Sequence, residues 1–253
     1  ASGLKQKIIF SLLMIAVWRL GVQMPLYGIN NQAFVALAQS NSLIGFLDLF
    51  SGGALGKVSI LALGIGPFIT SSIIVQLVSV VIPSLEKLQK EEGEAGRRKL
   101  SQYTRIFTVV LAIFQSFVFM MYLHHVPNAI MAQVNPVAFY ASSVCVLTAG
   151  AVLVMWISEL ITENGIGNGG SLIIFCGILS GIPIYASNTA KIVKASSQMQ
   201  LGLVLLLAIF FLAMVLVEIM QEAVRKVIIV NPKRQIGNKV YGGMNSFIPF
   251  KPH

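Results

Sequence analysis

Residues 58–82 read VSILALGIGPFITSSIIVQLVSVVI, an apolar run long enough to cross a bilayer. A helix surrounded by lipid gains nothing from small or polar residues, whereas a helix beside a pore or another helix can use them for close approach or contact with water. Within this run lie Gly64, Gly66, Pro67, Thr70, Ser71, Ser72 and Gln76. The pattern therefore predicts a helix that lines a conduit.

A shorter stretch, IGFLDLFSGGAL at residues 44–55, precedes this run and is too short to span a membrane. The chain is expected to enter the membrane, break at Gly52 and Gly53, and start again. Asp48, inside the short piece, is expected to cap or orient its half-helix. Because irregular backbone at membrane depth is tolerated only in a protein interior or beside a water-filled cavity, the break favours a conduit over a simple anchor.

The composition indicates an integral membrane protein. Of the 253 residues, 56% are hydrophobic and 11% are charged, whereas charged residues make up about 25% of ordinary soluble domains. The first apolar run lacks a small-residue cleavage site and is interpreted as a retained span. In it Arg19 is expected to snorkel to the interface, and Pro183 is expected to end or kink the fifth run. The six predicted spans are residues 8–26, 58–82, 106–123, 137–157, 171–186 and 201–219.

The distribution of Lys and Arg predicts the orientation. Most of the 18 basic residues lie before the first span, in residues 83–105, or after the sixth span. The opposite side holds only Arg19, Lys57, Lys191 and Lys194. The positive-inside rule then places both ends of the chain in the cytosol. The loop at residues 158–170 should be cytosolic too, but it has no basic residue and adds no support.

Two polar segments on the predicted cytosolic side differ in character. Residues 84–105 mix Glu with basic side chains, which is typical either of a solvated loop that orients the protein or of a docking site for a soluble partner. Residues 222–241 place basic side chains around a β-prone run. Such an extended loop can hold cations toward an anion such as ribosomal RNA or acidic lipid.

The string GIGNGG at residues 165–170 matches the letters of a dinucleotide-binding motif. No strand is expected before it, and no acidic residue follows about twenty positions later, as that motif requires. A tight turn into the fifth span is the better interpretation, with Asn168 satisfying free backbone groups.

The sequence contains no apparent catalytic or metal-binding constellation. Glu159 and Glu163 share a helical face and could do acid–base work, but carboxylates at a cytosolic helix end are more often solvated. Cys145 and Cys176 are interpreted as small buried hydrophobic residues. We therefore expect no enzyme activity, no cofactor and no metal. A secondary transporter remains the alternative because transporters also use broken helices, although residues 64–76 offer it no charged side chain.

Five strings carry a family resemblance: LFSGGALGKVSILALGIGPFITSSIIVQL (49–77), EEGEAGRRKLSQYTR (91–105), LAIFQS (111–116), ITENGIGNGGSLIIFCGI (161–178) and KRQIGNKVY (233–241). Together they resemble the SecY family, the channel subunits of the Sec protein translocon. LEKLQKEEGEAGRR, at residues 85–98, also looks like cyanobacterial and plastid members. The resemblance implies an all-α, polytopic transmembrane helical bundle with six spans here and a broken second helix. It implies a channel that passes unfolded polypeptides across the membrane and releases apolar segments sideways into lipid.

The resemblance also implies roles for single positions. Residues 44–57 match the plug that sits in the channel, and a ring of apolar side chains forms the constriction. Such a ring closes around a crossing chain without hydrogen-bonding it and resists wetting by ions when empty. The helix from about residue 66 to residue 80 matches one wall of the lateral gate, together with the third span. The implied residues are Phe50, Ser51, Gly52 and Gly53 for the plug core, Ile65, Ile69 and Ile174 for the pore ring, and Thr70, Ser71 and Gln76 for the gate.

The implied partners are the SecA motor, the ribosome, small subunits of the SecE and SecG type, signal-sequence-bearing polypeptides and membrane lipid. The two cytosolic segments match the surfaces that engage the motor and the ribosome. The basic residues implied in these contacts are Arg97, Arg98, Lys99, Arg105, Lys233, Arg234 and Lys239. The implied location is a bacterial plasma membrane, with a thylakoid membrane as the alternative.

Two departures limit the resemblance. The family has ten spans in two five-span halves, whereas this chain holds the first half, at about residues 1–190, and the sixth span with its cytosolic loop, at about residues 191–253. We therefore expect it to be part of a longer polypeptide whose second half is missing here. Asn238 and Lys239 also stand where many bacterial members carry two Arg, which weakens the expected docking.

Overall fold

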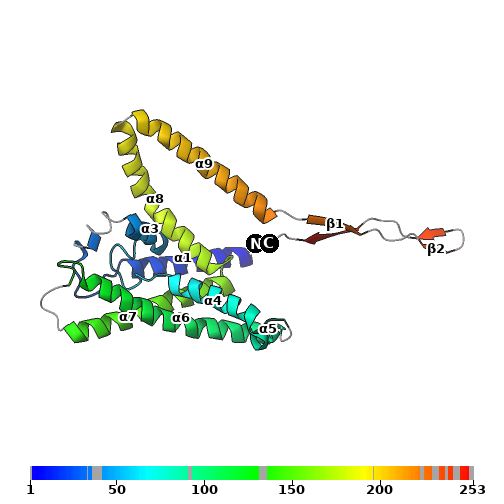
Figure 1. Ribbon diagram of the computed structural model, residues 1–253, viewed down its shortest axis with the longest axis horizontal. Helices are drawn as coiled ribbons and strands as arrows, with labels where there is room; N and C mark the ends of the chain where they lie inside the picture. The colour runs from blue at the N-terminus through cyan, green and yellow to red at the C-terminus, as the bar shows by residue number, and fades with distance from the viewer. Residues whose placement is uncertain are drawn as a thin grey trace. The chain divides into compact units, whose positions relative to one another are not determined.

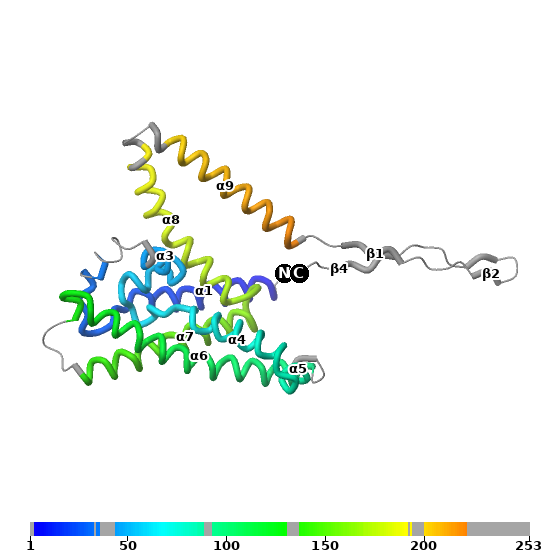
Figure 2. Tube along the Cα trace, viewed as in Figure 1, coloured from blue at the N-terminus to red at the C-terminus, as the bar shows by residue number. Residues whose placement is uncertain are grey.

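The computed structural model describes residues 2–32, 34–35, 42–90, 93–130, 136–195 and 197–222, together with four short strands between residues 225 and 250. The chain divides into two compact units, Ala1–Tyr185 and Ala186–His253 (Figures 1 and 2). The described part of the first unit is mainly helical, as expected of a polytopic helical bundle.

The first unit is built on a pair of long helices, α6 and α7, that lie side by side (Figure 1). Helix α4 packs on α6, and α1 packs on α7. Its helices are α1 (Ser2–Val22), α3 (Ser42–Ser51), α4 (Gly66–Val81), α5 (Pro83–Lys90), α6 (Gly93–His124), α7 (Pro136–Asn164) and the larger part of α8 (Gly169–Ala195).

Small buried side chains let α6 approach its neighbours closely. Thr108, Ala112 and Ser116 recur on one face of α6 and are fully buried. The Ser116 hydroxyl lies 3.3 Å from that of Thr148 in α7 and also donates to the Ala112 carbonyl at 2.6 Å. Association between helices in lipid depends on such packing and hydrogen bonds, because lipid tails are as apolar as the helices themselves.

Two apolar clusters fill the first unit. One gathers the loop after α1 and the adjoining ends of α6 and α7, with Leu26, Val58 and Met120 among its buried members. The other joins α1 to α7 and α8 through Trp18 and Ile157, both about 2% exposed. The second cluster also holds the start of α4, so it surrounds the region where the sequence predicts the broken span.

Helix α4 begins later than the apolar run predicts. The run starts at Val58, but residues 58–65 form a series of turns and the helix starts at Gly66. Val58 and Gly64 both have positive φ, 46° and 55°, a conformation that a right-handed helix excludes. Pro67 then stands in the first turn of α4, where its missing N–H costs no hydrogen bond. Hydropathy alone predicts neither the positive φ values nor the helix start at the proline.

Among the described residues, four helices are long and apolar enough to cross a membrane: Gly93–His124, Val137–Asn164, Gly169–Lys191 and Gln200–Gln221. They correspond to four of the six predicted spans. Helix α1 has 21 residues and carries Lys5, Lys7 and Arg19. Helix α4 has 16 residues, which gives about 24 Å of helix against a hydrocarbon core of about 30 Å. The count of six spans, and the reading of the second as a broken membrane helix, stay predictions.

The second unit contains the end of α8, α9 (Ser197–Glu222) and two small antiparallel sheets. The sequence predicts that Pro183 ends or kinks this run. Helix α8 runs through Pro183 to Ala195, so Pro183 does not end it, and the kink stays a prediction. Strand β1 (Arg225–Ile229) pairs with β4 (Ser246–Phe250), and β2 (Arg234–Ile236) pairs with β3 (Lys239–Tyr241). The second pair lies within the basic segment that the sequence predicts to be extended.

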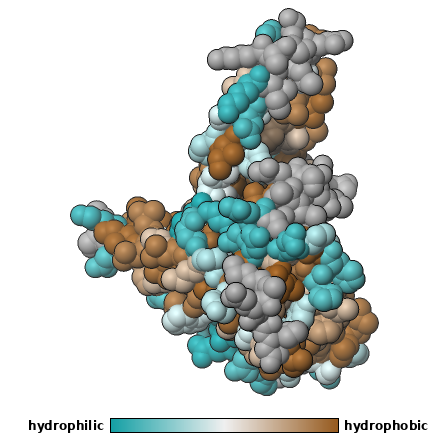
Figure 3. Space-filling model, turned by 90° about the vertical axis from the view of Figure 1, so that its left-hand side faces the viewer, coloured by the Kyte–Doolittle hydropathy of each residue, from teal (hydrophilic) through white to brown (hydrophobic). Residues whose placement is uncertain are grey.

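Large apolar side chains cover much of the surface of the first unit. Ile106, Phe114 and Phe117 of α6 are each more than half exposed, and Figure 3 shows hydrophobic residues at the surface beside hydrophilic ones. Such faces suit contact with lipid or with further protein, and the chain is an integral membrane protein. Cys145 is exposed in α7, so the prediction that it is buried is wrong, whereas Cys176 is partly buried. A cysteine in an apolar run can face lipid or the protein interior, and the sequence of the run does not distinguish the two.

Candidate functional site

The segment after α3 folds into a closed turn around the Asp48 carboxylate. Its Oδ1 atom accepts hydrogen bonds from the Gly56 amide at 2.6 Å and from the Ser51 hydroxyl at 3.2 Å. The Ser51 oxygen in turn accepts from the Leu55 amide at 3.0 Å. The sequence predicts that Asp48 caps or orients its half-helix. In the structure it organises the turn that follows α3, because its carboxylate satisfies an amide eight residues along the chain.

Gly52, at the start of this turn, is held between α1 and α8. The Arg19 Nη1 atom donates to the Gly52 carbonyl at 2.6 Å. A Cβ atom on Gly52 would lie 2.7 Å from Trp18 Cη2 and 3.1 Å from the Gly177 Cα. The sequence predicts that Arg19 snorkels to the interface. In the structure its guanidinium binds the protein's own backbone. No sequence pattern points to Trp18 or Gly177 at this site, because both residue types occur in any apolar helix.

The other predicted plug residues differ in exposure. Ser51 is 8% exposed and Gly53 is half-buried, whereas Phe50 is 42% exposed. The Phe50 ring packs edge-on against Phe46 of α3, with 5.0 Å between ring centroids. The turn is thus buried against α1 and α8, whereas the aromatic rings of the preceding helix α3 are exposed.

The three predicted pore-ring residues come together in the second apolar cluster. Ile65 is 4% exposed and is one of its buried members. Ile69 of α4 and Ile174 of α8 are partly buried and pack against that cluster. The cluster also contains Ala54 from the predicted plug. Side chains from three separate parts of the chain therefore meet beside the turn, and each is apolar and branched except the alanine.

The predicted gate residues do not form one contact. Ser71 is buried and donates its hydroxyl to the Pro67 carbonyl at 2.8 Å. Thr70 is exposed and donates to the Gly66 carbonyl at 3.0 Å, so both hydroxyls are satisfied within α4. Gln76 is exposed on the same helix. Of the three side chains, Gln76 is best placed to contact a neighbouring helix or lipid headgroup outside the first unit.

The predicted cytosolic contact residues are only partly described. Arg97, Arg98 and Lys99 are exposed near the start of α6. Lys233 lies outside the described residues, and only the backbone is described for Arg234 in β2 and Lys239 in β3.

Arg105 makes an ion pair that the sequence analysis did not anticipate. Its Nε atom donates to Glu159 Oε1 at 2.9 Å, which joins α6 to α7. Glu159 is therefore a partner of Arg105 and not simply a solvated carboxylate. The Arg105 side chain is 47% exposed, so the pair is worth less than about 1 kcal/mol.

The turn between α7 and α8 has the form that the glycine-rich string predicts. Asn168 Oδ1 accepts from the Ser171 amide at 3.1 Å and so caps the start of α8, which confirms the prediction for Asn168. Ser11 of α1 accepts from the Ile166 amide at 3.0 Å, and Thr162 accepts from the Gly169 amide at 2.9 Å. These bonds use the backbone groups that a nucleotide phosphate would need.

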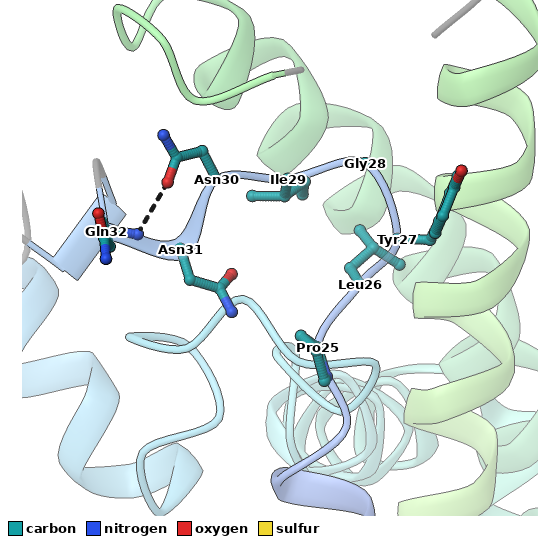
Figure 4. Close-up of a pocket in the computed structure, with 8 residues that line it drawn as sticks. All are labelled: Pro25, Leu26, Tyr27, Gly28, Ile29, Asn30, Asn31 and Gln32. Carbon is teal, nitrogen blue, oxygen red and sulfur yellow. Dashed lines mark hydrogen bonds between the residues drawn. The ribbon is translucent and has the colours of Figure 1, made fainter. Parts of the chain in front are cut away.

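A shallow hollow of about 480 Å³ lies against the loop after α1, lined by residues 25–32 (Figure 4). Within it the Gln32 amide donates to Asn30 Oδ1 at 3.2 Å. The loop supplies amides and apolar groups, with Tyr27 as its one titratable side chain. No group of three or more His, Cys, Asp or Glu in the described residues could hold a metal ion. The turn that follows α3 and the second apolar cluster are therefore the better candidate site.

Comparison with known proteins assigns the arrangement to a family. The SecY family model matches residues 59–252. The chain belongs to the SecY family. Curated members named protein translocase subunit SecY are 42% identical in Pyropia yezoensis, 40% in Synechococcus elongatus and 40% in Aquifex aeolicus. The matches cover 98% to 99% of this chain and 57% to 59% of those relatives, so the chain spans little more than half their length.

Solved structures show the same fold. "The structure of a protein conducting channel" aligns with a TM-score of 0.64 at 14% identity, over 98% of this chain and 53% of that one. A structure titled "The plug domain of the SecY protein stablizes the closed state of the translocation channel and maintains a membrane seal" aligns with a TM-score of 0.63 at 14% identity, over 98% and 52%. The predicted helical-bundle fold is confirmed. The alternative of a secondary transporter gains no support from these relatives.

Proposed function

We propose that this SecY-family chain forms part of a protein-conducting channel, in which residues 44–57 act as the plug and Ile65, Ile69 and Ile174 contribute to the constriction. The observation that carries the proposal is the meeting of these three side chains with Ala54 in one apolar cluster. Family membership and the solved channel with a plug domain support it.

The channel works passively in this proposal. Branched apolar side chains offer a crossing polypeptide no hydrogen bonds, so they do not retain it, and an empty apolar constriction resists wetting. Directionality must come from a motor, a ribosome or the membrane potential. Helix α4 serves as one wall of a lateral exit for apolar segments, with Thr70 and Ser71 bonded inside the helix and Gln76 free to contact a neighbour.

The proposed partners bind at the cytosolic side. The exposed Arg97, Arg98 and Lys99 and the basic residues at 233–239 supply positive charge for a ribosome or a SecA-type motor. Small subunits of the SecE and SecG type, and the second half of the channel, would cover the apolar surfaces. The solved complex titled "Sec61 in the Canine ribosome-channel complex from the endoplasmic reticulum" supports ribosome docking by analogy of fold, at a TM-score of 0.53. The proposed location is a bacterial plasma membrane or a thylakoid membrane, with both chain ends cytosolic.

Polar substitution in the constriction tests the proposal. Ile65→Asn and Ile69→Asn, made together in a full-length channel that carries this sequence, should raise ion conductance in the absence of a translocating chain, because amides invite water into the seal. The measurement is conductance of purified channels in planar bilayers. Ile73→Asn is the matched control, since Ile73 lies on the same helix and is 52% exposed. Wild-type conductance in the double variant, or an equal rise in the control, would contradict the assignment.

A further inference from the structure

Arg19 is a charged side chain in α1, which the sequence predicts to be a membrane span, and its bond is directed to the proposed plug. The residue is partly buried, and its Nη1 atom donates to the Gly52 carbonyl at 2.6 Å across 33 residues of sequence. Charged residues at membrane depth are costly, so they are rarely kept without a partner or a function. The short distance is typical of a charge-assisted hydrogen bond, which is roughly twice as strong as a neutral one.

Two residues near Arg19, Trp18 in α1 and Gln23 just after the helix ends, contact the same segment. The Trp18 ring lies against Gly52, where it leaves no room for a Cβ atom. Gln23, one helical turn beyond Arg19, accepts a hydrogen bond from Lys57 Nζ at 2.6 Å. Helix α1 and the residue that follows it thus contact both ends of residues 52–57. The Lys57 contact is exposed and contributes little, whereas the Arg19 bond is part-buried and dominates.

We propose that Arg19 is a positioning residue for the plug: its guanidinium holds the Gly52 carbonyl and so keeps residues 52–57 seated against α1 and α8 when no polypeptide is crossing. This inference rests on the proposed function, because it assumes that residues 44–57 close the channel. The seat needs a glycine at 52, since the carbonyl can reach Arg19 only if the backbone lies directly on the Trp18 ring and on Gly177. Displacement of the plug breaks one strong hydrogen bond and leaves the rest of α1 packed on α7.

The test measures seating and sealing separately. Ala54 is fully buried in the second apolar cluster, so an Ala54→Cys reporter, with Cys145 and Cys176 replaced by Ala, should be protected from a water-soluble maleimide while the plug is seated. Arg19→Ala in the full-length channel should raise both the labelling rate and the resting ion conductance about tenfold, the low end expected for loss of a hydrogen bond to a charged group. Arg19→Lys keeps a cationic donor of similar reach and should restore most of the protection.

Two further variants make the result decisive. Lys7→Ala removes a positive charge from an exposed position on the same helix and should change neither readout. Deletion of residues 44–57 should raise conductance whether or not Arg19 matters. If the deletion raises resting conductance but Arg19→Ala changes neither the conductance nor the labelling of residue 54, the role of Arg19 is refuted and the plug assignment is retained. If the deletion does not leak, the plug assignment itself is refuted.

Discussion

Replacing Gly52 with alanine should unseat the plug through two separable costs. Gly52 has φ of +68°, where an L-residue costs about 1–2 kcal/mol. The added Cβ would lie 2.7 Å from Trp18 Cη2 and 3.1 Å from the Gly177 backbone, and such overpacking costs about 1–3 kcal/mol. The seated state should therefore lose about 2–5 kcal/mol. At about 1.4 kcal/mol per tenfold change, the ratio of unseated to seated plug rises at least about thirtyfold.

Gly53→Ala is the control that isolates the packing cost. Gly53 has φ of +85°, but a Cβ atom there meets nothing within 4 Å, so this variant carries the backbone cost alone. Resting conductance of the full-length channel in planar bilayers should therefore rise in both variants, and by about five- to a hundredfold more in Gly52→Ala. Equal conductance in the two variants would refute the view that close contact with α1 and α8 seats the turn.

Two further predictions concern packing and charge. Gly150→Ala should lower the thermal unfolding midpoint of the detergent-solubilised protein by the equivalent of about 1–3 kcal/mol, because its Cβ would overlap the carbonyl of Ile60; Gly202→Ala, with open space around it, should be neutral or stabilising, and a neutral Gly150→Ala would contradict the packing. Replacing the basic residues at 233, 234 and 239 with Ala should weaken ribosome binding and reduce the slope of log affinity against log salt by about 2, whereas Lys191→Ala should leave the slope unchanged; an unaltered slope in the triple variant would argue against RNA contact.

The sequence anticipates the fold wherever apolar length decides the structure. Helices α6 to α9 each coincide with a predicted span because a bilayer-length apolar run has few other stable arrangements. It fails where backbone conformation overrides hydropathy. Residues 58–65 are as apolar as the helix that follows. Because φ is positive at Val58 and Gly64, however, these residues are not helical, and α4 begins at Gly66 with Pro67 in its first turn. Pro183 is the opposite case, because the helix α8 continues through a residue that could have ended it.

The residues of the candidate site could be named from the sequence, but their contacts could not. The family strings suggest which residues form the plug and the constriction, and a local bond such as that from the Ser171 amide to Asn168 Oδ1 follows from turn chemistry. The bond from Arg19 to Gly52 joins positions 33 apart and depends on how α1 packs, so one residue taken alone suggests only an interfacial cation. Glu159 is similar, because its partner Arg105 lies 54 positions away.

A plug must be held firmly enough to seal and weakly enough to move, and the contacts of Gly52 fit that requirement in magnitude. Moving a two-state equilibrium from 1:99 to 99:1 takes about 5.5 kcal/mol of differential binding. One hydrogen bond to a charged group supplies about 1.5–3 kcal/mol, and the glycine contacts with Trp18 and Gly177 add dispersion without a side chain that must be withdrawn from a pocket. If large interlocking side chains held the plug, the free energy needed to displace it would exceed the binding free energy that an entering polypeptide supplies. A plug whose backbone is held by one arginine keeps the closed state dominant, and an entering polypeptide can still displace it.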